Sequence, residues 1–214
     1  MTVVRTAFKS QDQGFKFVNS FPFPYSVSFK LPFAGEINLG DIVYGLCGGM
    51  CFAAQDYFTS GKPIPTYTKV DEIPSNFLLY LWNRQLDSLG LLVVPKVIEW
   101  MLRSDIDVGR LTVQYEIPKI RRRLDQGQPV VMGLIRVQRG DDPTRNHQVL
   151  AEGYDLDDLA KRITLFLYDP NHPDQEPTIS LNLAHPSLGI EPVQSTGEPL
   201  RGLFLIKYKP QAPP

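Results

Sequence analysis

The hydrophobic positions of this chain change their spacing near residue 128. Between Cys47 and Ser60, small and apolar residues recur at the spacing of one helical face. After Gln128 the apolar residues instead form short β-branched or aromatic runs, separated by turn-forming loops. Helices that come first and strands that follow predict an α+β fold, in which a helix-rich N-terminal half packs on an antiparallel β-sheet. A doubly wound parallel sheet would need strands that alternate with helices, and the pattern lacks that alternation.

Capping and stop residues define four predicted helices. Gly61 stops the first helix, and Gly90 stops the second, which begins with Ser75 or Asn76 as its N-cap. Pro95 falls in the first turn of the third helix, where a proline is tolerated. The fourth helix again has a proline near its start and a glycine past its end. The predicted helices cover residues 47–60, 75–90, 94–104 and 116–127.

The remaining segments complete one predicted domain over residues 1–208. Residues 1–40 alternate aromatic and polar side chains between prolines, which predicts an extended or β segment that wraps the core. The proline-containing end, 209–214, predicts a flexible tail. The predicted strands cover residues 129–137, 147–154, 162–169, 178–183 and 202–209.

The composition of the chain excludes several classes of partner. A hydrophobic content of 43% over 214 residues is enough for one buried core. The 22 basic and 23 acidic residues give a net charge of -1, which provides no field to recruit nucleic acid or an anionic membrane surface. The basic stretch at 119–126 alternates with apolar residues at helical spacing, which is typical of the solvated face of a helix. We therefore expect neither nucleic acid nor a membrane as a partner.

The chain also lacks recognisable targeting signals. Its N-terminus has no apolar run with a small-residue cleavage site, and no stretch of about 18 apolar residues could span a membrane. A cytoplasmic location is therefore expected. The two cysteines fit a reducing compartment of this kind, in which thiols stay free.

Both cysteines lie in the stretch YGLCGGMCFAAQDYF, residues 44–58, four positions apart. A disulfide between them would have to fit narrow dihedral limits on one helix face, and the cytosol opposes it. A structural zinc site needs four ligands, and the chain has no second cysteine pair and no histidine pair. A calcium loop over 169–176 lacks the glycine expected at its sixth position. We therefore expect no metal and no cofactor.

The position of each thiol in the predicted helix suggests its chemistry. Cys47 lies at the helix start, where unpaired N–H groups and the helix dipole lower a thiol pKa and stabilise an oxyanion. Cys51 lies about 6 Å further along the axis, inside the apolar stripe, where a thiol is usually a small buried hydrophobe. Gly48 and Gly49 have no side chains, so they would let a substrate backbone approach Cys47 and would form part of the oxyanion site.

A reactive thiolate needs a base, and the chain has three histidines. His172 and His185 are both followed by proline, which places them in loops. His147 opens a predicted strand. As a single residue, however, a histidine is more often structural than catalytic.

The predicted hairpin gives His147 a partner. If the strands 147–154 and 162–169 form an antiparallel hairpin centred on Asp158, paired residue numbers sum to 316 and His147 faces Asp169. This would set an imidazole beside a carboxylate, as a Cys–His pair requires. A one-residue slip would put the two side chains on opposite faces, and Asp169 would then only start a turn.

Three segments of the sequence resemble a known family. CGGMCFAAQDYF, HQVLAEGYD and LFLYDP resemble the Cys, His and Asp blocks of papain-like cysteine peptidases, most closely the bacterial leader peptidases that process bacteriocin precursors after a double glycine. The resemblance implies a papain-like α+β fold and a bacterial thiol hydrolase. It implies Cys47 as the nucleophile, His147 as the base and Asp169 as its orienter. An alignment to papain itself could instead match CFAA and select Cys51.

The sequence departs from this family at one position. The family usually has a glutamine six residues before the nucleophile as an oxyanion donor, and this chain has Asp41 there. An ionised carboxylate cannot donate a hydrogen bond and repels an oxyanion. The leading interpretation is a cysteine peptidase or amidase that acts on a peptide or amide substrate through an acyl-enzyme. The alternatives are a catalytically inactive papain-like module that binds peptides and an acyltransferase of the transglutaminase type.

Overall fold

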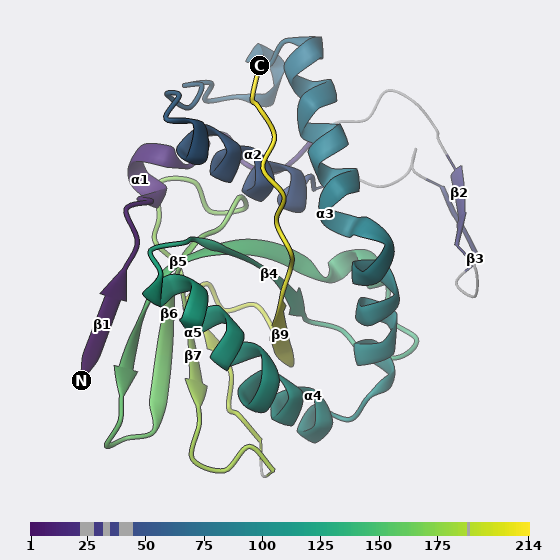
Figure 1. The fold of residues 1–214 in the computed structure, drawn as a ribbon. Coiled ribbons are helices and arrows are strands. Elements are labelled where there is room, and N and C mark those ends of the chain that lie inside the picture. Colours follow the sequence, from purple (N-terminus) through teal and green to yellow (C-terminus); the bar gives the residue numbers. More distant parts are fainter. Residues whose placement is uncertain (22–27, 32–34, 39–44, 188) are drawn as a thin grey trace.

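The computed structural model describes residues 1–21, 28–31, 35–38, 45–187 and 189–214 (Figure 1). It has mixed α and β structure with an antiparallel sheet, which confirms the predicted α+β class. Its α-helices are α1 (Ser10–Gln13), α2 (Cys47–Ser60), α3 (Ser75–Leu102), α4 (Asp105–Leu111) and α5 (Ile117–Asp125). Its strands are β1 (Thr2–Arg5), β2 (Ser28–Leu31), β3 (Gly35–Asn38), β4 (Val130–Ile135), β5 (His147–Asp157), β6 (Arg162–Tyr168), β7 (Thr178–Asn182), β8 (Val193–Gln194) and β9 (Gly202–Leu205).

The main sheet has the strand order β8-β7-β6-β5-β4-β9, and every pairing in it is antiparallel. The long strand β5 is its centre, because it pairs with β4 along its first half and with β1 along its second half. β2 and β3 form a separate antiparallel pair. The sequence predicted the five longer strands of the second half but neither the short β8 nor the α4 helix.

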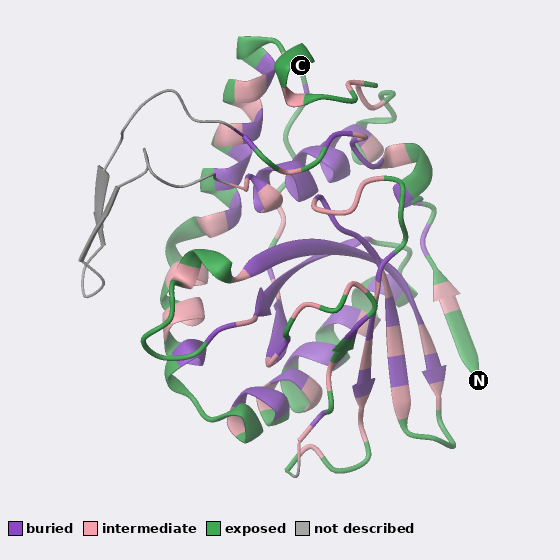
Figure 2. Ribbon diagram, turned by 180° about the vertical axis from the view of Figure 1, so that it is seen from behind, coloured by how far each residue is buried: buried purple, intermediate pink, exposed green. Residues whose placement is uncertain are grey.

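Helices cover both faces of the sheet. On one face, α2 and α3 enclose an apolar cluster that includes Met50, Leu81 and Phe204. On the other face, α5 packs Ile120 and Leu124 against the strands. Figure 2 shows the result, since β4 and most of β5 are buried along their length. The start of β5, where His147 lies, is therefore held inside a packed core.

The structure agrees with the predicted helix ends at the two glycines, Gly61 and Gly90. α2 begins at Cys47 and ends at Ser60, and the C-cap Gly61 has the left-handed conformation with φ 67°. α3 contains a break at Gly90, with φ 37°, so the second and third predicted helices follow each other without a loop. The predicted N-cap is wrong, because Pro74 occupies the cap position and no side chain caps the helix.

The described N-terminal residues 1–21 pack against the core through four phenylalanines. Phe8, Phe15, Phe17 and Phe21 are all buried in the cluster that surrounds α2. They pack edge-on or tilted against one another and against aromatic side chains of α2 and α3. Burial of large aromatic side chains is a strong source of stability, so this segment is part of the folded unit.

The C-terminal segment 209–214, expected to be a flexible tail, is instead held against α2 and α3. Its anchor is the buried ion pair in which Arg84 Nε lies 2.7 Å from Asp56 Oδ2. Arg84 also donates to the Lys209 carbonyl at 2.9 Å, and Asp56 Oδ1 accepts from the Gln211 amide at 2.9 Å. A buried ion pair needs partners for its remaining donors and acceptors, and the tail backbone supplies them.

Among the described helices, none combines the length and apolarity needed to cross a bilayer.

Candidate active site

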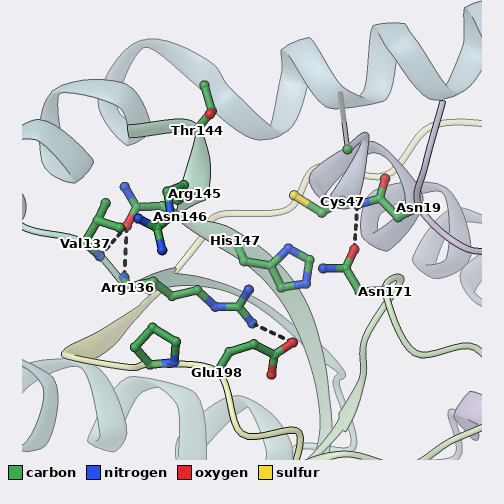
Figure 3. Close-up of a pocket in the computed structure, with 12 residues that line it drawn as sticks. Asn19, Cys47, Arg136, Val137, Thr144, Arg145, Asn146, His147, Asn171 and Glu198 are labelled. Carbon is green, nitrogen blue, oxygen red and sulfur yellow. Dashed lines mark hydrogen bonds and ion pairs between the residues drawn. The ribbon is translucent and has the colours of Figure 1, made fainter. Parts of the chain in front are cut away.

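The starts of two secondary-structure elements and one loop bring the three candidate catalytic groups together. Cys47 is the first residue of α2, His147 is the first residue of β5, and Asp169 directly follows β6. α2 packs directly on β5, where the Cys51 thiol donates to the Gln148 carbonyl at 3.7 Å. Figure 3 shows Cys47 and His147 projecting into the same pocket. The fold therefore places the Cys47, His147 and Asp169 side chains near one another.

The imidazole and the carboxylate form a short hydrogen bond. His147 Nε2 lies 2.7 Å from Asp169 Oδ1, and the two residues are only 6% and 1% exposed. The backbone amide of Asn171 donates to the same carboxylate oxygen at 2.9 Å. An ionised carboxylate can only accept, so Nε2 carries the proton. The other ring nitrogen, Nδ1, is then left for the hydrogen bond between His147 and Cys47.

The register that suggested this pair is wrong, and a β-bulge restores the pairing. Near the turn, Asp157 faces Arg162, so paired numbers sum to 319 rather than 316. That odd offset would put His147 and Asp169 on opposite faces of the hairpin. β5 bulges between Ala151 and Gly153, and on the His147 side of this bulge the numbers of paired residues sum to 318. The two side chains then share one face as diagonal neighbours, which is close enough for their hydrogen bond.

The charges of the triad stabilise one another. Burial raises the pKa of the Cys47 thiol, but the His147 imidazolium and hydrogen bonds from His147, Gln148 and Gly48 lower it below its ordinary value. Burial lowers the pKa of His147, but Asp169 and the Cys47 thiolate raise it to about 9. Burial likewise raises the pKa of Asp169, and the His147 imidazolium outweighs this effect and lowers it. All three directions favour a thiolate–imidazolium pair with an ionised carboxylate behind it.

The interactions that act on the second cysteine all raise the pKa of its thiol. Cys51 is fully buried, and burial raises the pKa of its thiol well above the ordinary value. Cys47 is partly exposed and lines the pocket. Both thiols are free. A buried, protonated thiol is a poor nucleophile, so the geometry favours Cys47 over Cys51.

The two glycines after Cys47 contact the protein itself rather than an open cleft. A side chain at Gly48 would lie 2.1 Å from the Ser88 hydroxyl oxygen, and one at Gly49 would lie 2.2 Å from the Leu81 carbonyl oxygen. The Gly49 amide already donates to Gln85 Oε1 at 2.8 Å, so it is not free for an oxyanion. These glycines therefore let α3 approach the start of α2 closely, which is a different role from the one we expected.

Asn19 is a site residue that the sequence did not reveal. It lines the pocket beside Gly45 and Cys47, and its side-chain amide donates to Asn171 Oδ1 at 2.9 Å. Its backbone amide donates to the Pro170 carbonyl at 3.0 Å, which ties the N-terminal segment to the loop that carries Asp169. No local pattern marks Asn19, because only the wrapping of the N-terminal segment brings it here. Asp41, the expected residue at the oxyanion position, lies outside the described residues.

The cavity at the site has a volume of about 390 Å³ and is lined mainly by polar residues, which together expose polar and apolar surface in similar amounts. Arg136, Arg145, Asn146 and Glu198 lie around it, and Figure 3 shows Arg136 paired with Glu198. His172 contacts a lining residue rather than the triad, since its Nε2 lies 3.0 Å from Glu198 Oε1. Within the described part of the chain, no three His, Cys, Asp or Glu side chains come together as a metal-binding group.

Comparison of the chain with protein-family models, with curated proteins and with solved structures found no match. Any functional assignment therefore rests on the sequence motifs and on the geometry of the site.

Proposed function

We propose that this chain is a papain-like thiol hydrolase that cleaves a peptide or other amide bond through an acyl-enzyme on Cys47. The observation that carries the proposal is the grouping of Cys47, His147 and Asp169 at one solvent-accessible cavity, with the imidazole beside the thiol and 2.7 Å from the carboxylate. A nucleophile, a base and a group that orients the base are the parts that such chemistry requires.

In this proposal the Cys47 thiolate attacks the carbonyl carbon of the substrate. The His147 imidazolium then gives its proton to the leaving amine, and the same imidazole later takes a proton from the water that hydrolyses the thioester. Asp169 holds the ring so that Nδ1 faces the sulfur, and it stabilises the imidazolium. No metal or other group is needed for these steps.

The oxyanion formed in each step needs hydrogen-bond donors. The first N–H groups of α2 have no intrahelical partners, so the Cys47 amide is one candidate donor. The side-chain amide of Asn19 is a second, because one of its two N–H groups remains after the bond to Asn171. Asn19 would thus supply the amide that the papain-like family usually takes from a glutamine before the nucleophile.

The electrostatics favour a catalytic site over a module that only binds peptides. Burial alone would leave a neutral thiol and a neutral imidazole, which are the forms that an inactive core would keep. The pKa of Cys47 is instead lowered and that of His147 is raised to about 9. Buried groups whose pKa values are shifted toward their charged forms by specific partners are typical of reaction centres.

Selective alkylation tests the proposal. At neutral pH an ordinary thiol is only a few per cent ionised, so iodoacetamide should label Cys47 about tenfold faster than a free thiol. The variants Cys47→Ala and Cys51→Ala form a matched pair, because both remove one sulfur from the same face of α2. We expect Cys47→Ala to lose labelling and all turnover of fluorogenic peptide amides, and Cys51→Ala to keep both. Labelling confined to Cys51, or hydrolysis by the Cys47→Ala protein, would exclude the proposed chemistry.

A further inference from the structure

A second cavity opens on the same cysteine and histidine. It has a volume of about 360 Å³, and Cys47 and His147 line both this cavity and the polar one. Its walls come mainly from α3 and from the strands β4 and β9. The reacting sulfur therefore lies where a polar cavity and a second, differently lined cavity meet.

The lining of the second cavity is apolar along α3, with one aromatic and several aliphatic side chains. These apolar side chains are only half-buried, although they line a cavity, so the described residues leave open a surface that core packing would normally close. The side chains are Trp82, Leu89, Val93, Val94, Val97 and Ile98. They extend over roughly four turns of α3, on both sides of its break at Gly90.

The polar residues of this cavity gather at the end nearest Cys47. Thr144, Asn146 and His147 also belong to the polar cavity. Gln85 bonds the Gly49 amide beside the nucleophile, and Gln148 follows His147 in β5. The cavity thus changes from polar at the sulfur to hydrocarbon further away.

This gradient distinguishes between two kinds of occupant. A peptide that entered the cavity would bury backbone N–H and C=O groups against aliphatic walls, and each unpaired polar group would cost free energy. A hydrocarbon chain has no such groups and gains from the burial of every methylene. The elongated lining also suits a chain better than a single side chain.

We propose that this cavity binds the hydrocarbon chain of a fatty-acyl substrate whose carbonyl carbon lies at Cys47 Sγ. The inference rests on the proposed function and specifies its substrate class as a fatty acid in amide or ester linkage to a polar group. The polar cavity then receives the leaving group, beside Arg136 and Arg145.

The reaction balances with water as the co-reactant. The thiolate forms a bond to the acyl carbon, and the bond from that carbon to the leaving nitrogen or oxygen breaks, with its electron pair going to the leaving atom. His147 protonates that atom. Water then attacks the thioester, gives one proton to His147 and displaces the thiolate, which releases the free fatty acid.

The test uses p-nitrophenyl esters of increasing acyl length, with rates corrected for those of Cys47→Ala. The value of kcat/KM should rise about fourfold for each added methylene until the cavity is filled. Val94→Phe should lower the ratio of kcat/KM for the octanoyl ester to that for the acetyl ester by tenfold or more, because the ring occupies the cavity. Leu91→Phe is the matched control, since Leu91 is 94% exposed on the same helix and lies outside the lining. Its ratio should equal that of the wild type.

Binding of octanoate to the Cys47→Ala protein, measured by calorimetry, separates the cavity from the reaction. Octanoate that binds this protein, and binds its Val94→Phe form more weakly, supports the inference. If octanoate binds but no ester acylates Cys47, the cavity assignment stands and the proposed reaction fails. The inference would be overturned if kcat/KM were equal for the acetyl and octanoyl esters. It would also be overturned if a phenylalanyl peptide ester acylated Cys47 faster than the octanoyl ester. Either result would leave the thiol chemistry in place.

Discussion

The role of Asp169 can be tested by removing its charge without changing its shape. In Asp169→Asn the amide oxygen still accepts from His147 Nε2 and from the Asn171 amide, which the carboxylate now does at 2.7 and 2.9 Å. The substitution therefore isolates the electrostatic contribution of the carboxylate. Asp174 provides a matched control, because it lies in the same loop, is exposed, and pairs only with Lys16 among the described residues.

The size of the effect follows from the pKa of His147. That pKa is about 9, against 6.5 for an ordinary imidazole, a difference that corresponds to roughly 3 kcal/mol in favour of the imidazolium. Burial acts in the opposite direction and lowers the pKa of His147, so Asp169 and the Cys47 thiolate together favour the imidazolium by more than roughly 3 kcal/mol. Loss of one adjacent opposite charge typically lowers such a pKa by about one to three units. The pKa of His147 would then fall to roughly 6–8, so the imidazolium, and with it the thiolate, would be less populated at neutral pH than in the parent protein.

The assay is the rate of iodoacetamide alkylation as a function of pH, in a Cys51→Ala background so that Cys47 is the sole thiol. We expect Asp169→Asn to react at least tenfold more slowly than its parent at neutral pH, and to recover only when alkali ionises the thiol directly. Asp174→Asn should reproduce the parent profile. An unchanged profile for Asp169→Asn, or an equal loss in both variants, would refute the assigned role of the carboxylate.

Three further predictions concern stability. Gly48→Ala should lower the free energy of unfolding by about 1–3 kcal/mol in urea titrations, because its methyl group would lie 2.1 Å from a hydroxyl oxygen of α3. Arg84→Met should lower the free energy of unfolding by about 3–5 kcal/mol in the same assay, since it leaves the buried Asp56 carboxyl without its ion-pair partner. The double variant Arg84→Met with Asp56→Leu should recover part of this loss. In Cys47→Ala, which removes the titration of the thiol, Asp169 still acts to raise the pKa of His147. The contribution of this pair to stability should then be fully present below pH 6.5 and be lost as pH rises through the folded-state pKa of His147. Further replacement of His147 by Gln should abolish that pH dependence in urea titrations.

The elements that the sequence predicted correctly are those with local signals. The start of α2 at Cys47 and its end before Gly61 follow from a helical stripe and a glycine stop, and both are observed. The strand that begins at His147 follows from a β-branched run. Because these two starts depend on nearby residues alone, the Cys and His of the candidate site could be identified from sequence patterns.

The register of the hairpin could not be predicted in the same way. The bulge at Glu152 depends on the N-terminal segment, since the Thr6 amide donates to the Glu152 carbonyl at 2.9 Å and the Ser10 amide donates to its side chain at 2.7 Å. These contacts join residues more than 140 positions apart. The turn alone would have set a register in which His147 and Asp169 point to opposite faces.

Long-range contacts also explain the other differences. Asn19 reaches the site only because the aromatic residues around it pack on α2, and no periodicity in that segment shows this. The C-terminal segment is held by a buried ion pair whose two members, Asp56 and Arg84, lie on different helices. Sequence patterns describe single elements, whereas these features arise from the contacts between elements.

The central claim is that Cys47 is a thiolate at neutral pH because His147 is protonated beside it. The ultraviolet absorbance of the thiolate, recorded against pH as the difference between the wild type and Cys47→Ala, measures this directly. We predict a thiolate signal that is already present well below the ordinary thiol pKa of about 8.5 and that His147→Ala shifts to alkaline pH. A signal that develops only above that value in the wild type, or that His147→Ala leaves unchanged, would contradict the claim.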